Sequence, residues 1–321
     1  MAKTFHPAPG WPQPSAGWQP PAGWQPNPEW PAAPLGWVFW TDTSLHEEGT
    51  AAATDMRRSV ALRFGWLITL IVGVVAYLVV LYVMVGTSNI LMFPSLLLIG
   101  SVTVPMSVLL LAYGTEEYAT GHGGLVTLTV IAGAVIGTTT AAFVEYSTLK
   151  TLPWLGMIAV GLIEEAAKLI VPLVIFLTMR KHSPGLGLVL GVASGAGFAA
   201  LETMGYGLAE LIVSQGNLAA VDTTLLMRGI LSPAGHVAWS GLTCAALWRM
   251  GEIPPPTNRW PVFLGAYLLA AGLHAAWDGT TALIPHLLVA VISVAVLLTL
   301  VATQSRRTHR AGVLAAPARQ D

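Results

Sequence analysis

The chain has 321 residues, enough for two ordinary soluble domains, but 54% of them are hydrophobic and only 10% are charged. Roughly a quarter of the residues in a typical soluble chain are charged, so this composition excludes an ordinary soluble enzyme and predicts a chain embedded in a lipid bilayer. The formal net charge of −1 provides no basic surface, and nucleic acid is not expected as a partner. The single cysteine, Cys244, excludes an intramolecular disulfide and every cysteine-based metal cluster.

Residues 1–60 are predicted to form a disordered cytoplasmic tail. They hold ten of the 22 prolines and six of the 12 tryptophans, in a GWxP-like repeat. Such low-complexity sequence favours the polyproline II conformation and does not build a packed core. We expect the tryptophans to contact the membrane interface, and a docking site for a partner that reads proline motifs is the alternative. The polar start of the chain predicts no signal peptide.

The rest of the chain contains eight apolar runs, each long enough to cross a bilayer, which takes about 20 residues. They are predicted at 64–85, 90–112, 125–147, 152–179, 186–209, 225–248, 261–281 and 284–302. Kinks are expected at Pro94, Pro105, Pro172 and Pro233. The predicted fold is an all-α, polytopic integral membrane bundle of about eight transmembrane helices over residues 61–303, followed by a short basic cytoplasmic tail, 304–321.

Lysine and arginine residues in the short loops predict the orientation, because cytoplasmic loops carry the excess of these residues. With eight crossings, four basic clusters fall on one side of the membrane: Arg57, Arg58 and Arg63; Arg180 and Lys181; Arg249 and Arg259; and Arg306, Arg307 and Arg310. Only Lys150 and Arg228 fall on the other side. Both termini are therefore expected in the cytoplasm.

The fourth apolar run contains two acids and a base within about two helical turns, in the segment Glu164-Glu165-Ala166-Ala167-Lys168. The spacing lets the Lys168 ammonium reach either carboxylate on one helix. Two adjacent carboxylates do not both ionise readily in a low dielectric, and the lysine lets one stay charged while the other holds a proton. This division suits general acid–base catalysis. An ion pair that only joins helices is the alternative, although ionisable residues inside a membrane mark functional sites by default.

Three further runs carry ionisable residues. Glu202 lies on the fifth and His236 on the sixth, while His274 and Asp278 lie on the seventh with an i,i+4 spacing that lets the carboxylate orient the imidazole. At about 1.5 Å per residue, Glu164, Glu202, His236 and His274 lie about 10–18 Å from the extracytoplasmic face. Random placement would scatter them through the hydrocarbon layer, so the common depth predicts one buried polar site.

Carboxylates, a lysine and two histidines can together activate a water molecule and stabilise an oxyanion, which amide hydrolysis requires. A serine mechanism is not expected, since nothing around Ser232 or Ser240 resembles a nucleophile elbow. Cys244 is expected to pack in the core. A proton- or ion-coupled transporter is the strongest alternative. It would show matched repeats in the two halves, yet the first three runs lack internal acids except Glu145.

These segments resemble the motifs of a known family, the PrsW family of intramembrane proteases. Glu164-Glu165-Ala166-Ala167-Lys168 is similar to EExxK, Phe198-Ala199-Ala200-Leu201-Glu202 to FxxxE, and His236 and His274-Ala275-Ala276-Trp277-Asp278 to the two histidine motifs. The motifs occur in the family's order over roughly Pro153 to Leu283. The distantly similar CAAX-prenyl and bacteriocin-processing proteases have EExxxR and FxxxH instead, so Lys168 and Glu202 favour the PrsW branch. Thr203 departs from the family's usual Asn but leaves the glutamate intact.

The resemblance implies an intramembrane endopeptidase in which Glu164 and Glu165 activate the attacking water, His274 is required, and His236 and Glu202 complete the site. It also implies a membrane-tethered protein substrate, such as an anti-sigma factor, and a bacterial cell membrane. The depth of the site predicts cleavage near the extracytoplasmic face of the bilayer.

Two supporting residues follow from the spacing itself. Lys168 is expected to keep one glutamate ionised, and Asp278 to orient His274.

The sequence leaves the presence of a metal open. Glu202, His236 and His274 would form a Zn²⁺ set with an open fourth position, and the family is classed as metalloprotease-like. The same residues also serve a metal-free glutamic mechanism in which the histidines bind the oxyanion. The metal-free mechanism is favoured because the HxxxH or ExxH clustering common in zinc enzymes is absent, and because Lys168 beside the base disfavours a nearby cation.

Overall fold

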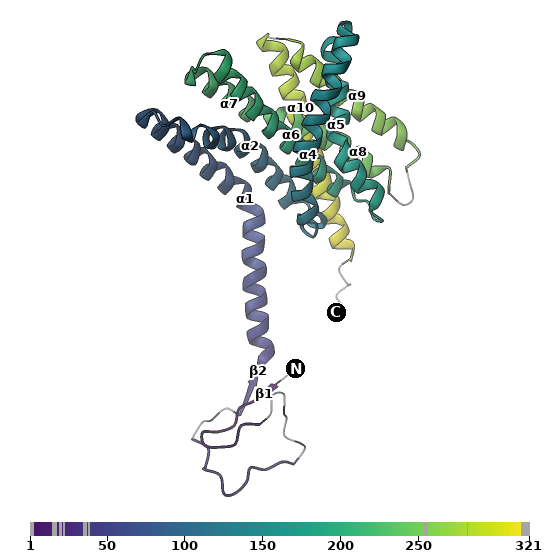
Figure 1. Ribbon diagram of the computed structural model, residues 1–321. Coiled ribbons are helices and arrows are strands. Elements are labelled where there is room, and N and C mark those ends of the chain that lie inside the picture. Colours follow the sequence, from purple (N-terminus) through teal and green to yellow (C-terminus); the bar gives the residue numbers. More distant parts are fainter. Residues whose placement is uncertain are drawn as a thin grey trace. The chain divides into compact units, whose positions relative to one another are not determined.

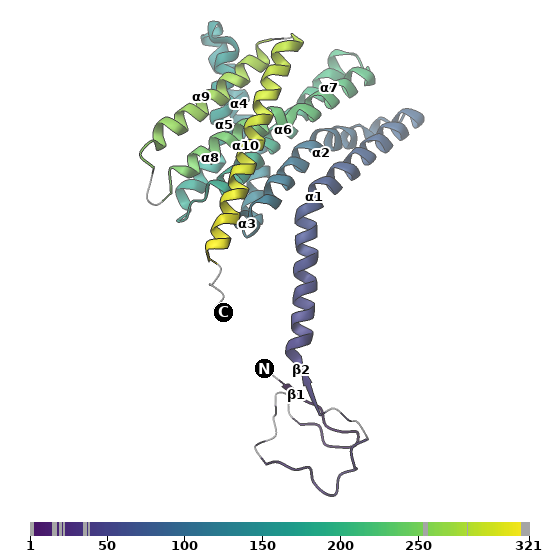
Figure 2. The ribbon, with the colours of Figure 1, turned by 180° about the vertical axis from the view of Figure 1, so that it is seen from behind.

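The structure is a computed structural model that describes residues 3–14, 18, 21, 23–34, 37, 39–252, 256–280 and 282–315, with the backbone alone over 40–62, 117–118 and 305–315. It divides into two units, Met1–Ala61 and Leu62–Asp321. Figure 1 and Figure 2 show the helices of the second unit from two sides.

The first unit contains two short strands and a tryptophan cluster. Strands β1 (Lys3–Phe5) and β2 (Trp40–Asp42) pair antiparallel. Between them the tryptophan repeat forms turns in which a tryptophan N–H donates to the carbonyl three residues earlier, as from Trp24 to Pro21 at 3.0 Å. The Trp24 ring packs edge-on against Phe5, with 5.7 Å between centroids. Helix α1 (Thr43–Thr87) begins within residues 1–60, and the disorder and cytoplasmic location of this segment stay predictions.

The second unit is helical throughout its described residues. After α1 it contains η1 (Ile90–Met92), α2 (Phe93–Thr115), α3 (Glu117–Thr120), α4 (Gly123–Thr151), η2 (Pro153–Leu155), α5 (Gly156–Thr178), α6 (Pro184–Val213), α7 (Leu218–Leu231), η3 (Ser232–Ala234), α8 (His236–Arg249), α9 (Arg259–Asp278) and α10 (Leu283–Ala315). The predicted all-α, polytopic membrane architecture is confirmed.

Six helices within the described residues are long and apolar enough to cross a membrane. They are Arg63–Thr87, Ile90–Thr115, Gly123–Thr151, Pro184–Val213, Arg259–Asp278 and Leu283–Gln304. These coincide with six of the eight predicted runs. Helix α5 coincides with a seventh, but it carries Glu164, Glu165 and Lys168, so composition alone does not mark it as a span. The count of eight stays a prediction.

The sixth apolar run is not one kinked helix over 225–248, as predicted, but two helices joined by a 3₁₀ turn. Helices α7 and α8 have 14 residues each, too few to cross a bilayer alone. Pro233 in η3 cannot donate a backbone hydrogen bond, and Gly235 has φ −124° and ψ −123°, far from helical values. The break makes His236 the first residue of α8.

Helix α6 is the centre of the unit, and it is buried continuously over residues 185–200. Glycines let neighbouring backbones approach it closely. A Cβ atom at Gly191 would meet the carbonyl oxygen of Ser240 on α8, and one at Gly195 would meet that of His236. The same close approach joins α5 to α9, where a Cβ atom at Gly161 would meet the carbonyl oxygen of Ala271.

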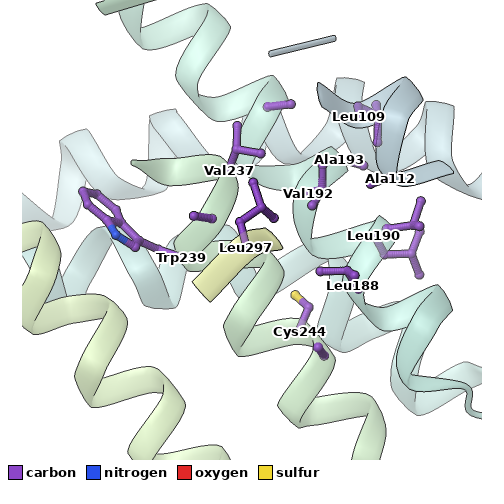
Figure 3. Close-up of a cluster of buried hydrophobic side chains, with 14 of the residues drawn as sticks. Leu109, Ala112, Leu188, Leu190, Val192, Ala193, Val237, Trp239, Cys244 and Leu297 are labelled. Carbon is purple, nitrogen blue, oxygen red and sulfur yellow. The ribbon is translucent and has the colours of Figure 1, made fainter. Parts of the chain in front are cut away.

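The apolar core surrounds α6. Figure 3 shows side chains from α6, α8, α2 and α10 meeting there, including Val192, Trp239, Leu109 and Leu297. Cys244 is fully buried in this core, as predicted. The close contacts of α6 with α8 and of α5 with α9 bring the polar residues of four helices to one place.

Candidate active site

Seven ionisable side chains from four helices meet in one buried cluster. They are Glu164, Glu165 and Lys168 on α5, Glu202 on α6, His236 on α8, and His274 and Asp278 on α9. The structure therefore brings together every site residue that the sequence predicts. Charged groups in such a position need partners, because water is not available to solvate them.

Lys168 lies at the centre of this cluster, and its side chain is 1% exposed. Its Nζ atom is 2.8 Å from Glu165 Oε1, 3.2 Å from Glu164 Oε2 and 2.7 Å from His236 Nδ1. An ammonium group has three protons to donate and accepts none. Two of the contacts, with Glu165 and His236, are hydrogen bonds, and the contact with Glu164 is an ion pair.

These contacts determine the tautomer of His236. Since the Lys168 ammonium can only donate, Nδ1 of His236 accepts, and the ring proton is on Nε2. That nitrogen lies 2.8 Å from Oε2 of Glu202, so the proton faces a carboxylate. His236 is therefore a neutral imidazole held between a cation and a carboxylate.

His274 has carboxylates on both sides of its ring. Its Nδ1 atom is 2.9 Å from Glu165 Oε1, and its Nε2 atom is 3.1 Å from Asp278 Oδ2 and 3.4 Å from Glu164 Oε2. The indole of Trp239 stacks on the imidazole, with 4.7 Å between centroids. Acceptors at both nitrogens suit a ring that donates from both. The predicted contact between Asp278 and His274 is present. The contact between Glu165 and His274 is one that the sequence does not predict.

Arg228 on α7 is a member of the site that the sequence did not identify. Its guanidinium lies 2.9 Å from Glu202 Oε2 and 3.8 Å from the centre of the Tyr206 ring. In the sequence, Arg228 served only to predict the orientation of the chain in the membrane. Its position inside the sixth apolar run, in reach of an acid on the fifth, was the available signal.

Two cavities border the cluster. The first, the α10 cavity, has a volume of about 450 Å³, an apolar wall formed by Met227, Leu231, Trp239, Leu283, Leu287 and Ala290, and a polar side formed by Arg228, His236 and Asp278. The second, the α4 cavity, has a volume of about 360 Å³ and is lined by Thr138, Glu145, Glu164, Glu202 and Tyr206. Glu145, which has no predicted role, thus faces the same space as Glu164 and Glu202.

One comparison with known proteins identifies a family. The profile of the PrsW family intramembrane metalloproteases matches residues 121–303. The chain belongs to the PrsW family. No curated protein and no solved structure matches it. The matched segment contains all seven residues of the cluster, and this PrsW-family protein is therefore a peptidase embedded in the membrane, as its motifs predict.

The family's description implies a metal ion. The side chains whose ligand atoms lie together in the structure differ from the predicted set of metal ligands. Glu164, His236 and His274 each offer a ligand atom within 4.8 Å of the others. The sequence had placed Glu202 in this set instead of Glu164. Glu202 contacts His236 on Nε2, the side away from His274, and is held there by Arg228, whereas Glu164 lies between the two imidazoles.

The position of Lys168 conflicts with a metal at these donors. Zinc would lie about 2.0–2.2 Å from both a histidine nitrogen and a carboxylate oxygen. Yet the Lys168 ammonium is 2.7 Å from His236 Nδ1 and 3.2 Å from Glu164 Oε2. The residue types suit a metal, but this arrangement does not accept one unless Lys168 moves.

Proposed function

We propose that this protein is an intramembrane endopeptidase that cleaves a membrane-tethered protein near the extracytoplasmic face, with the attacking water activated at the Glu164–Glu165 pair. The observation that carries the proposal is the place of Glu164. Its Oε2 atom lies 3.4 Å from His274 Nε2 and 3.8 Å from His236 Nδ1, and its side chain borders the α4 cavity. A carboxylate in that position can take a proton from a water molecule in the cavity.

The two glutamates have different roles in this mechanism. Glu165 is 1% exposed, and its Oε1 atom is engaged by Lys168 at 2.8 Å and His274 at 2.9 Å. It does not line either described cavity. Glu164 is therefore the general base, and Glu165 is a positioning residue that holds the lysine and the imidazole on either side of it.

The reaction uses one water molecule. Glu164 removes a proton from the water as its oxygen attacks the carbonyl carbon of the scissile bond, which produces a tetrahedral oxyanion. His274 and Lys168, which lie 3.4 Å and 3.2 Å from Glu164 Oε2, place positive charge close to that oxyanion. Glu164 then returns the proton to the leaving nitrogen as the carbon–nitrogen bond breaks, giving a carboxylic acid and an amine.

Lys168 is the reason why the proposed mechanism uses no metal ion. The ammonium contacts the Glu164 and His236 atoms that a metal would need, and it places a positive charge where hydrolysis develops a negative one. Glu202 and Arg228 support the site from the other side by holding the neutral tautomer of His236.

The setting of the reaction follows from the charge distribution. Both termini are placed on the cytoplasmic side of the membrane, because the four basic clusters mark one face under eight crossings. The resemblance to the family implies that this is a bacterial cell membrane. The substrate is then a membrane protein cut toward the outer side, of which an anti-sigma factor is an example. A reporter fused after Asp321 should read cytoplasmic, and an extracytoplasmic signal would contradict this orientation.

The proposed function is tested in proteoliposomes that contain the purified protein and a single-pass membrane protein as substrate. The wild type should release the extracytoplasmic part of the substrate, and Glu164→Gln should not. A transporter that uses the same carboxylates would leave the substrate intact with either protein.

A further inference from the structure

The α10 cavity has the size and character of a binding pocket. Its volume of about 450 Å³ lies within the usual range of about 300–1,000 Å³ for ligand pockets. Its wall is mostly apolar, with a few polar groups of the site on one side, as ligand pockets commonly are. It is much larger than the space that one water molecule needs. The cavity therefore has room for part of a substrate.

We propose that the α10 cavity binds a bulky apolar side chain of the substrate beside the scissile bond, and so determines which bonds are cut. This inference rests on the proposed function, since it concerns the same site. His236 and Asp278 belong both to the polar cluster and to the cavity. A side chain in the cavity thus lies beside His236 and Asp278, which are 3.8 Å from Glu164 and 3.1 Å from His274, respectively.

The charges in the cavity wall exclude a charged side chain as the occupant. Arg228 is paired with Glu202 at 2.9 Å, and Asp278 with His274 at 3.1 Å. His236 is held by Lys168 and Glu202. A charged side chain would enter a mostly apolar space whose ionised side chains are already in ion pairs, which is unfavourable. An apolar side chain instead gains from the burial of its surface.

The rim of the cavity fits a substrate that arrives from within the bilayer. Met227 on α7 is 56% exposed, and Leu287 on α10 is 54% exposed. In a membrane these side chains face lipid. A substrate helix can therefore approach between α7 and α10 and insert a side chain without crossing a polar surface.

Ala290 on α10 allows a direct test, because it is the smallest side chain that α10 contributes to the wall. In Ala290→Phe the ring would fill part of the cavity. Val291→Phe is the matched control, since Val291 is the next residue, is 67% exposed and does not line the cavity. Leu287→Ala changes the pocket in the opposite direction by enlarging it.

The probe is a set of single-pass membrane peptides in proteoliposomes, identical except for Ala, Leu or Phe at the residues beside the outer end of the helix. Product masses locate the cut, and kcat/KM is measured for each peptide. The wild type should prefer Leu or Phe beside the cut. The preference is the ratio of kcat/KM for the Leu or Phe peptide to kcat/KM for the Ala peptide. Ala290→Phe should lower this ratio by about 10–200-fold, the range that small changes in an apolar pocket produce. Val291→Phe should keep the wild-type preference.

Three results would overturn the inference. One is equal cleavage of the three peptides by the wild type. Another is an unchanged preference in folded Ala290→Phe, as expected if the cavity holds a lipid chain. If Ala290→Phe does not fold, Leu287→Ala provides the test, because its enlarged pocket should shift the preference toward the Phe peptide. An unchanged preference in Leu287→Ala would then contradict the inference. Absence of any Glu164-dependent cleavage instead contradicts the proposed function itself.

Discussion

The ammonium nitrogen of Lys168 lies 2.7 Å from Nδ1 of His236, although the two residues are 68 positions apart in the chain. This contact joins α5 to the start of α8 and makes the lysine the hub of the site. Through it, one cation is shared by two glutamates and an imidazole. The protonation of His236 and the disagreement with a bound metal both follow from this one relationship.

The first prediction concerns zinc. The wild type should contain less than one equivalent of zinc after purification, and chelation should leave its activity unchanged, because Lys168 occupies the space between the donors. In Lys168→Met the same donors, Glu164, His236 and His274, become free to bind zinc. Elemental analysis of both proteins should therefore show a gain in the variant. The gain should disappear when His236→Ala is added.

A stoichiometric zinc ion in the wild type, lost together with activity on chelation, would contradict this prediction. It would mean that Lys168 leaves the position described here when the metal binds. Loss of activity in Lys168→Met is expected in either case, because the variant removes a charge that Glu164 and Glu165 both use.

The second prediction concerns Asp278, which contacts His274 Nε2 at 3.1 Å. Asp278→Asn keeps the size of the side chain but removes its charge. We expect kcat to fall by about 10–100-fold, the range seen when the carboxylate partner of a functional histidine is changed. KM should change little, since the imidazole acts on the transition state. An unchanged kcat would show that Glu165 alone positions the ring.

The third prediction concerns the close approach of α6 and α8. In Gly195→Ala the added Cβ meets the carbonyl oxygen of His236, so α8 must shift and carry His236 away from Lys168. Thermal unfolding in detergent should show that the free energy of unfolding falls by about 1–3 kcal/mol, as for other overpacked sites. Activity should fall as well. Gly265→Ala on α9 is the control, because a Cβ there meets nothing within 4 Å; equal stability in the two variants would contradict the prediction.

The sequence predicted the members of the cluster because ionisable residues stand out in apolar runs. It could not predict the contacts within the cluster, which depend on the rotation of each helix. Glu202 and Glu164 are equally acidic in the sequence, but they approach opposite nitrogens of His236, and only Glu164 also reaches His274. For this reason the donor atoms that lie together in the structure include Glu164, where the predicted zinc set has Glu202.

The other differences come from the break before α8. Pro233 predicted a kink, but the sequence gives no sign that Gly235 leaves the helical region altogether. The resulting turn separates α7 from α8 and lets Arg228 reach Glu202 while His236 reaches Lys168. The break also forms part of the α10 cavity, since Ser232 and Gly235 line it.

Cleavage by Glu164→Gln tests the central claim most directly. The wild type and the variant are placed in proteoliposomes with a single-pass substrate, and the released fragment is measured over time. Because Glu164 is the proposed base, the variant should lose activity by at least about 100-fold while it unfolds at a temperature close to that of the wild type. Cleavage by folded Glu164→Gln at the wild-type rate would contradict the proposed role of Glu164.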